Sequence, residues 1–459
     1  MSHVSADCEG ITTADTPTAY RGNLNVNIVQ LTPGAGAMYC GNCLRDNALV
    51  RALRGLGHQV LMVPLYLPLT LDEADQSAGT PVFFGGINVY LEQKSSFFRR
   101  APGWLHRLLD SRPLLKWAAS RSGSTQVESL GDVTLSMLNG ESGHQARELD
   151  QLIEWLGQHE KPDVFFLSNA LLIGMARRLK SDLGRPVVCM LQGEDYFLDS
   201  LSEPYRKQCW DTLASRAKDA DLFLAPSHYF GDLMRKRLSL PPERVKIVYN
   251  GINLDGYPTQ PAKREQHPPV IGYLARMCKE KGLDLLIDAF TILHKRGRLP
   301  GLRLRAAGSL GPSDQGFVES LRGKLRAAGL SEFAEFYPNI DRDAKVAFLQ
   351  GLSVFSVPAR YSEAFGLYVL EALAAGVPVV QPRAAAFPEL IELAGGGVLF
   401  PAENPGALAD ALEPLLLDGK LAQAMGETGR LFVREHFSAE SMAQNLLEAL
   451  KEADSCLVG

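Results

Sequence analysis

Several features that mark whole classes of protein are missing from this chain. No stretch of its 459 residues approaches the roughly 18 consecutive apolar residues of a membrane-spanning helix. The first residues have neither the basic start nor the apolar run of a secretory signal. A net charge of -5 gives no general attraction to nucleic acid, whose binders carry a strongly basic face. We therefore expect a cytoplasmic protein with no nucleic-acid partner and a polar, disordered tail over residues 1–22.

Cysteine is too scattered for a disulfide framework. The seven cysteines are an odd number spread along the chain, which favours free thiols. Cys40 and Cys43 form a Cys-x-x-Cys pair, but zinc would need two more ligands and the chain has no second pair of this kind. A thioredoxin-type motif also begins a helix, which lowers the pKa of one thiol. The pair is interpreted either as small packing residues or as redox-sensitive thiols at the rim of a site.

The glycine-rich turn that contains this pair does not match a dinucleotide fingerprint. Gly34-x-Gly36 is followed by Tyr39 where the fingerprint requires a third glycine. The next strand-like run ends in LMVPLY without the acid that binds a ribose. An oxidoreductase built on this stretch is therefore disfavoured, although its glycines can bring backbone N–H groups close to a ligand.

What the chain has throughout is an alternation of strand-like apolar runs and helical patterns. This predicts parallel sheets covered by helices on both faces. A polar, proline-rich interval at residues 258–268 interrupts the alternation and is predicted to be a linker. The predicted fold is α/β, with two doubly wound, Rossmann-like domains that face each other across a ligand-binding cleft. The predicted boundaries are 23–257 for the N-terminal domain, 269–436 for the C-terminal domain, and 437–459 for a helix that packs back on the N-terminal domain.

Two glutamates are the best candidates for a binding site. Glu363 and Glu371 are eight residues apart, and Gly366 between them marks the predicted start of a helix. Eight helical residues rise about 12 Å, which does not suit the close carboxylate dyad of a glycosidase. The pair suits an extended ligand whose middle is an anion at the helix start, such as a nucleotide sugar.

Two cations are predicted to reach the same edge of the sheet. Arg276 and Lys281 follow a strand-like run and precede a helical pattern, so both lie where a diphosphate would meet them. As an isolated feature, the run Lys279-Glu280-Lys281 would be an ordinary solvated helix start.

These segments, in order, resemble the GT-B glycosyltransferases of family four, the retaining, nucleotide-sugar-dependent group that shares its fold with glycogen synthases. The resemblance covers roughly residues 24–455 and is strongest after residue 245. The matching pieces are Gly57-His58-x-Val60, VYNGINLDGY, ARMCKEKGLDLLIDAF, SVPARYSEAFGLYVLEALAAGVPVV, FPELIE and GGVLFPAENPGALADAL. The ordered set is specific in a way that no single piece is.

The resemblance implies a hexosyltransferase that moves a sugar from a nucleotide-diphosphate sugar to an unidentified oligosaccharide, glucan or lipid-linked acceptor. It implies three catalytic residues: Arg276 and Lys281 would neutralise the departing diphosphate, and Glu363 would contact sugar hydroxyls. Glu371 would bind the ribose. Beyond the nucleotide sugar, no cofactor and no bound metal are expected. The donor-binding residues implied in this way are Gly36, Gly41, Phe365, Gly366, Leu367 and Glu371.

The chain also departs from this family in its first domain. Gln192 stands where many relatives have a histidine that faces the transferred sugar, and glutamine cannot titrate. The first-domain contact is therefore Gln192 or one of Glu194 and Asp195, which are otherwise interpreted as part of a solvated turn. The same departure leaves open a catalytically inactive, sugar-nucleotide-binding regulatory protein.

Residues 93–121 form an unusual segment with seven Lys or Arg, one acid and several aromatic residues. Three interpretations remain: a lid, a peripheral contact with the anionic inner face of a membrane, or a helical excursion with a solvated basic face.

Overall fold

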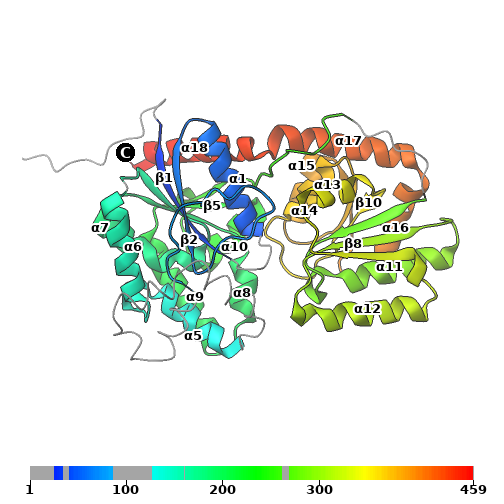
Figure 1. Ribbon diagram of the computed structural model, residues 1–459, viewed down its shortest axis with the longest axis horizontal. Helices are drawn as coiled ribbons and strands as arrows, with labels where there is room; N and C mark the ends of the chain where they lie inside the picture. Colours follow the sequence, from blue (N-terminus) through cyan, green and yellow to red (C-terminus); the bar gives the residue numbers. More distant parts are fainter. Residues whose placement is uncertain (1–24, 35–40, 86–126, 160, 261–267, 458–459) are drawn as a thin grey trace, which may run out of the picture.

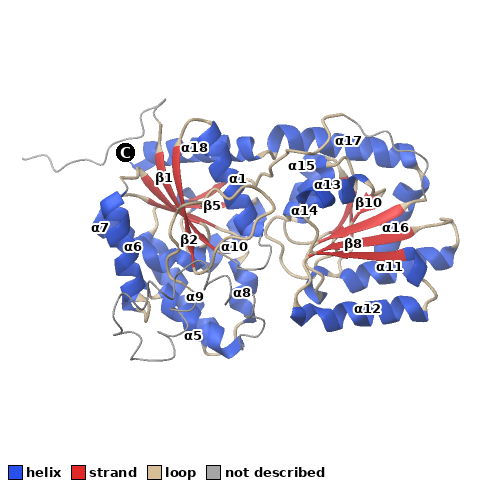
Figure 2. Ribbon diagram, viewed as in Figure 1, coloured by secondary structure: helices blue, strands red, loops and turns tan. Residues whose placement is uncertain are grey.

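The computed structural model describes residues 25–34, 41–85, 127–159, 161–260 and 268–457. Two α/β domains lie side by side (Figure 1), and in each of them helices enclose a parallel sheet (Figure 2). Within these ranges, no helix is both long and apolar enough to cross a membrane. The predicted tail (1–22), Gly36, Cys40 and the basic segment (93–121) lie outside the described residues.

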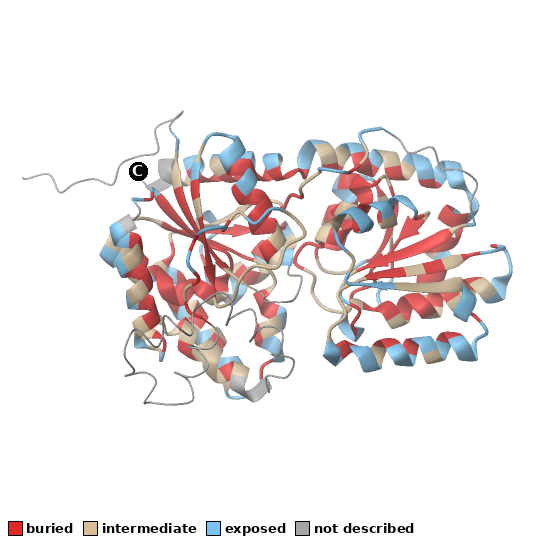
Figure 3. Cartoon of the chain, in the orientation of Figure 1, coloured by how far each residue is buried: buried red, intermediate tan, exposed pale blue. Residues whose placement is uncertain are grey.

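The first domain is built on a sheet of six described strands in the order β2-β1-β3-β4-β5-β6, all parallel. In its middle, Leu31 lies opposite Val63 on one side and Leu167 on the other. Because helices cover both faces, these apolar strands are buried (Figure 3). The strands are β1 Asn27–Pro33, β2 Gln59–Leu65, β3 Val164–Leu167, β4 Val187–Met190, β5 Leu222–Ala225 and β6 Val245–Ile247. The helices are α1 Gly41–Gly55, α5 Val127–Leu138, α6 Ala146–His159, α7 Ala176–Leu183, α8 Glu194–Ser200, α9 Tyr205–Arg216 and α10 His228–Arg237.

The second domain repeats this plan with described strands in the order β12-β11-β10-β7-β8-β9. Leu304 of β8 lies opposite Ile271 of β7 and Ala334 of β9. Together the two sheets confirm the predicted fold class. The strands are β7 Val270–Leu274, β8 Arg303–Gly308, β9 Ala334–Pro338, β10 Val354–Phe355, β11 Val379–Pro382 and β12 Gly397–Phe400. The helices are α11 Leu283–Arg296, α12 Gln315–Ala327, α13 Arg342–Gln350, α14 Leu367–Ala374, α15 Phe387–Ala394, α16 Pro405–Leu417 and α17 Gly419–His436.

The chain passes between the domains at two adjacent places. The N–H of Ile252 donates to the carbonyl oxygen of Phe437 at 3.0 Å, and the N–H of Ala439 donates to that of Ile252 at 2.9 Å. The first crossing therefore precedes the interval 258–268 that the sequence predicts as a linker. Beyond the second crossing, α18 (Ala439–Leu457) packs on α1 of the first domain (Figure 1). There Met442 is part of a buried hydrophobic cluster with side chains of α1 and of the first-domain strands.

Candidate active site

The two domains enclose a cleft with a volume of about 330 Å³, within the range of small-molecule sites. In the second domain, the cleft is lined by residues that come directly after the ends of β7, β8 and β9. In the first domain, it is lined by a residue just after β4 and by the start of α1. The cleft therefore lies at the carboxyl ends of both sheets, where a ligand is expected. The predicted site residues that line it are Gly41, Gln192, Arg276, Lys281, Glu363, Phe365, Gly366, Leu367 and Glu371.

An ion pair joins Lys281 to Glu363 in this cleft. Nζ of Lys281 is 2.6 Å from Oε2 of Glu363, and the two side chains are only 17% and 14% exposed. The pair forms because the turn that carries Lys281 is fastened to the loop before Glu363. In that contact the N–H of Arg360 donates to the carbonyl oxygen of Glu280 at 2.9 Å.

Two tyrosines complete the surroundings of this ion pair. The hydroxyls of Tyr368 and Tyr361 donate to Oε2 of Glu363 at 2.8 and 3.0 Å. Burial disfavours the charged form of Glu363, but the charge of Lys281 and the hydrogen bonds outweigh it and lower the pKa of Glu363. Glu363 is therefore held as a carboxylate that accepts hydrogen bonds, rather than as a proton donor.

Arg276 is oriented by a carboxylate of its own domain. Its Nε and Nη2 donate to the two carboxylate oxygens of Asp314 at 2.7 and 3.1 Å. This bidentate contact raises the pKa of Arg276. The arginine lines the cleft and is 51% exposed, so its Nη1 is available to an anion.

The start of α14 presents backbone N–H groups between the two glutamates. Gly366 is the N-cap residue, with a left-handed φ of 97°, and none of the described side chains caps the helix. Glu363 precedes this helix, and Glu371 lies in its second turn. An uncapped helix start favours an anion through its free N–H groups and its dipole. The predicted position of the helix start is confirmed.

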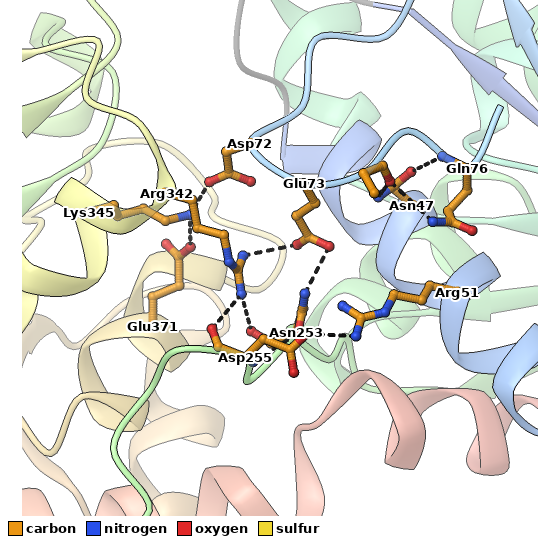
Figure 4. Close-up of polar contacts among 11 residues, drawn as sticks. Asn47, Arg51, Asp72, Glu73, Gln76, Asn253, Asp255, Arg342, Lys345 and Glu371 are labelled. Carbon is orange, nitrogen blue, oxygen red and sulfur yellow. Dashed lines mark hydrogen bonds and ion pairs between the residues drawn. The ribbon is translucent and has the colours of Figure 1, made fainter. Parts of the chain in front are cut away.

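Glu371 is bound by a lysine that sequence reasoning missed. Nζ of Lys345, on α13, lies 2.7 Å from Oε1 of Glu371 and 2.6 Å from Oδ2 of Asp72 in the first domain (Figure 4). One turn earlier, Arg342 pairs with Glu73 at 3.1 Å. Desolvation opposes the charge on Lys345, but its carboxylate neighbours outweigh this and raise the pKa of Lys345. The sequence gives no sign of the Asp72 and Glu73 pairs, because their members come from different domains.

The first domain approaches the start of α14 closely. A Cβ on Gly41, the first residue of α1, would lie 3.6 Å from Cδ1 of Leu367. Gln192 lines the same wall and exchanges two hydrogen bonds with Asn250, at 3.4 and 3.3 Å. This exchange orients the Gln192 amide and leaves it a second N–H and a second lone pair for a ligand.

Two acids beside Gln192 are not among the residues that line the cleft. Glu194 is buried and accepts hydrogen bonds from the N–H groups of Ala170 and Gln192 at 2.7 and 2.9 Å. Asp195 is buried as well. The interpretation of these acids as a solvated turn is therefore wrong, because the Glu194 carboxylate satisfies buried backbone groups. Desolvation raises the pKa of both carboxyl groups.

Cys43 is buried on α1, where its Sγ donates to the carbonyl oxygen of Pro33 at 3.3 Å. This environment favours the packing interpretation of Cys43. In the part of the chain that the structure describes, no group of three or more His, Cys, Asp or Glu side chains could hold a metal ion.

Comparisons with known proteins identify glycosyltransferase families in this chain. Residues 259–432 match the family described as Glycosyl transferases group 1, and residues 126–255 match Glycosyltransferase Family 4. A GDP-mannose-dependent alpha-(1-6)-phosphatidylinositol monomannoside mannosyltransferase of Mycobacterium tuberculosis is 28% identical over 229 residues, which are 47% of this chain and 58% of the relative. The chain thus spans just over half the length of this curated relative.

Two solved structures share the fold. Sucrose-phosphate synthase from Thermosynechococcus elongatus has a TM-score of 0.70 at 18% identity, over 94% of this chain and 100% of that one. Anabaena HepE in complex with UDP and glucose has a TM-score of 0.66 at 16% identity, over 93% of this chain and 99% of that one. The two family matches adjoin, one over the later part of the first domain and the other over most of the second. The chain belongs to the group 1 glycosyl transferases and has the GT-B architecture.

Proposed function

We propose that this protein is a retaining hexosyltransferase that moves a sugar from a nucleotide-diphosphate sugar to a carbohydrate or lipid-linked acceptor. The observation that carries the proposal is the Lys281–Glu363 pair beside the uncapped start of α14, in a cleft that also contains Arg276 and Glu371. Two cations and a helix start suit the diphosphate of a nucleotide sugar. The carboxylates on either side suit the hydroxyl groups of its ribose and of its sugar.

In the proposed reaction, the bond between the anomeric carbon and the diphosphate oxygen breaks, and the diphosphate keeps the electron pair. Arg276 and Lys281 donate hydrogen bonds to the departing oxygens, which stabilises the charge that develops in the transition state. The acceptor hydroxyl forms the new bond on the same face of the sugar, and its proton passes to the diphosphate. No side chain then has to act as the nucleophile.

The two glutamates have separate tasks in this proposal. Oε2 of Glu363 is already shared by Lys281 and two tyrosines, so Oε1 is the oxygen that accepts from the sugar hydroxyls. Glu371 accepts from the ribose hydroxyls at the other side of the helix start. In the first domain, Gln192 donates to or accepts from the transferred sugar.

The names of similar proteins support a nucleotide sugar as donor without deciding its base. The mycobacterial relative is named as GDP-mannose-dependent, and the Anabaena structure contains UDP and glucose. A phosphatidylinositol mannoside appears in the first name, which supports a lipid-linked acceptor. Peripheral membrane contact through residues 93–121 belongs to this proposal. Flotation with anionic vesicles tests it, and flotation unchanged by neutralising Arg99, Arg100 and Arg107 would contradict that segment as the contact.

Thermal shifts with UDP, ADP and GDP, followed by transfer assays with the matching sugar nucleotides, test the proposed activity. We expect stabilisation by at least one diphosphate and transfer or slow hydrolysis of its sugar. Glu371→Gln should weaken nucleotide binding, whereas Glu363→Gln should chiefly slow transfer. Failure to bind or turn over any of these donors would overturn the proposal, and unchanged kinetics in both variants would overturn the assigned roles.

A further inference from the structure

Two neighbouring carboxylates of the first domain reach across the cleft to two cations of the second. Asp72 and Glu73 follow β2, and Arg342 and Lys345 lie one turn apart on α13 (Figure 4). Lys345 is 2.6 Å from Asp72, and Arg342 is 3.1 Å from Glu73. All four side chains are at most 16% exposed, so solvent screens these contacts little.

The two ion pairs differ in the further contacts that Lys345 and Arg342 make. Lys345 also binds Oε1 of Glu371 at 2.7 Å, so Asp72 is linked through a single ammonium group to that glutamate. Arg342 instead donates to the backbone carbonyl oxygens of Asn253 and Asp255, both at 3.0 Å. All four residues line the cleft, but the Glu73 pair also binds the connection between the domains, whereas the Asp72 pair is linked to Glu371.

Only one of the two carboxylate oxygens of Asp72 has a hydrogen-bond partner among the described residues. Its Oδ2 binds Lys345, but its Oδ1 is buried and has no hydrogen-bond partner among the described residues. An unpaired buried oxygen destabilises the fold, so packing alone does not account for this residue.

The charges of the three linked groups also suit a hydroxyl ligand. Two carboxylates share the one positive charge of Lys345, so Asp72 prevents the lysine from neutralising Glu371 completely. Glu371 then keeps negative charge and a second oxygen, Oε2, with which it can accept hydrogen bonds from hydroxyl groups.

We propose that Asp72 is a positioning residue for the donor ribose, which acts through Lys345 on Glu371. Nucleoside recognition is then shared by both domains, because the carboxylate that tunes Glu371 comes from the opposite side of the cleft. This inference rests on the proposed function, in which Glu371 binds the ribose hydroxyls.

Nucleotide binding by the full-length protein tests this role. The probes are UDP, GDP and ADP, each compared with its 2′,3′-dideoxy form by isothermal titration calorimetry. The proteins are wild type, Asp72→Asn and the matched control Glu73→Gln, since each substitution removes one charge from the same loop with little change of shape. Glu371→Gln is the reference for loss of the ribose contact.

We expect Asp72→Asn to raise the Kd of the tightest-bound ribonucleotide about tenfold and that of its dideoxy form by less than about twofold. Glu73→Gln should change both constants by the same factor, because Arg342 does not touch Glu371. Retained binding of the dideoxy form also shows that the Asp72→Asn site is folded.

Two results would overturn this inference for different reasons. Equal weakening of both forms by Asp72→Asn would show that Asp72 acts independently of the ribose, and would leave the proposed function intact. Failure of the wild type to bind any of the three diphosphates would instead remove the proposed function, and this inference with it.

Discussion

The carboxylate of Glu389, on the second domain, accepts a hydrogen bond from the backbone N–H of His228, the first residue of α10 on the first domain, at 2.9 Å. It also accepts from the N–H of Tyr229 at 3.1 Å and from the hydroxyl of Tyr249 at 2.9 Å. One side chain thus satisfies two free N–H groups at the start of a helix in the other domain. Glu389 therefore stabilises the closed arrangement of the cleft.

We expect Glu389→Ala to open the ligand-free protein, so that its radius of gyration in X-ray scattering rises. Asp418→Ala is the matched control, because Asp418 accepts from the N–H groups of Lys420 and Leu421 at 3.0 Å but lies in the same domain as both. Each substitution should lower the free energy of unfolding by about 1 kcal/mol. Identical scattering from the two variants would mean that Glu389 does not control closure.

Lys281→Met should change how stability depends on pH. In the wild type, the pKa of Glu363 lies below its ordinary value of 4.5, so its stabilising contribution is present above pH 4.5 and is lost as the pH falls through the lowered value. Without Lys281, burial dominates and raises the pKa of Glu363 above 4.5. The variant then loses stability as the pH rises, and the gap in Tm between the proteins should widen from pH 4.5 to pH 7.

Thermal unfolding from pH 4.5 to pH 8 measures this gap. Breaking a largely buried pair should cost about 3 kcal/mol at pH 7. Lys281→Arg keeps the positive charge and should show little widening of the gap. A penalty for Lys281→Met that is the same at every pH would show that the lysine does not set the ionisation of Glu363.

Two glycines that border α11 offer a matched test of local packing. Gly282 and Gly297 have left-handed φ values of 74° and 67°. A Cβ on Gly282 would lie 2.0 Å from the carbonyl oxygen of Pro358, whereas a Cβ on Gly297 would meet no atom of the described residues within 4 Å. Gly297→Ala should cost about 1 kcal/mol from backbone strain alone.

Gly282→Ala should cost about 3 kcal/mol or more, because the turn that carries Lys281 must also move away from the loop that carries Glu363. Urea unfolding of both variants measures the difference, and nucleotide binding should be lost in Gly282→Ala alone. Similar stability of the two variants would contradict the close contact at Pro358.

Both sheets were predictable because their strands can be recognised from short apolar runs in the sequence. Runs such as VFFL and VVCM are apolar throughout, which fits strands covered on both faces, and both are fully buried. The start of α14 was predictable for a similar reason, since Gly366 can take the left-handed N-cap conformation without strain.

The partners of the site residues were less predictable than the residues themselves. Lys345 lies on α13, in RDAKVAFLQ, and Asp72 lies in an irregular segment of the other domain. Only the closed cleft brings them within 2.6 Å of each other. The contact of Ile252 with Phe437 and Ala439 is likewise not visible in the sequence, since it consists of backbone hydrogen bonds between segments far apart in the chain.

Removal of divalent metal should leave transfer unchanged. In the proposed mechanism, Arg276, Lys281 and the start of α14 neutralise the diphosphate, a task that a metal ion performs in other transferases. Initial rates after dialysis against EDTA should therefore match those measured with added Mg²⁺ or Mn²⁺. A rate that falls more than tenfold in EDTA and recovers with either metal would contradict the proposal that these protein groups neutralise the diphosphate without a metal ion.

Arg276→Lys should be a severe substitution although it keeps the positive charge. Arg276 lines the cleft and uses Nε and Nη2 to bind Asp314, which leaves the remaining nitrogen, Nη1, to meet a ligand. A lysine lacks the planar guanidinium fork, so it cannot keep the bidentate contact with Asp314 and also present a second, separately placed nitrogen to the diphosphate. We expect kcat/KM for the donor to fall by about 10² to 10³, as when one charge-stabilising donor is removed from an active site.

Asp314→Asn is the comparison that separates orientation from charge. It retains an acceptor oxygen for Arg276 and leaves the guanidinium charged, so the side chain loses alignment but not its attraction to the diphosphate. The KM for the donor should rise severalfold while kcat falls less than it does in Arg276→Lys. If Arg276→Lys kept wild-type kcat/KM, Arg276 could not be stabilising the leaving group, and Lys281 with the start of α14 would have to do so without it.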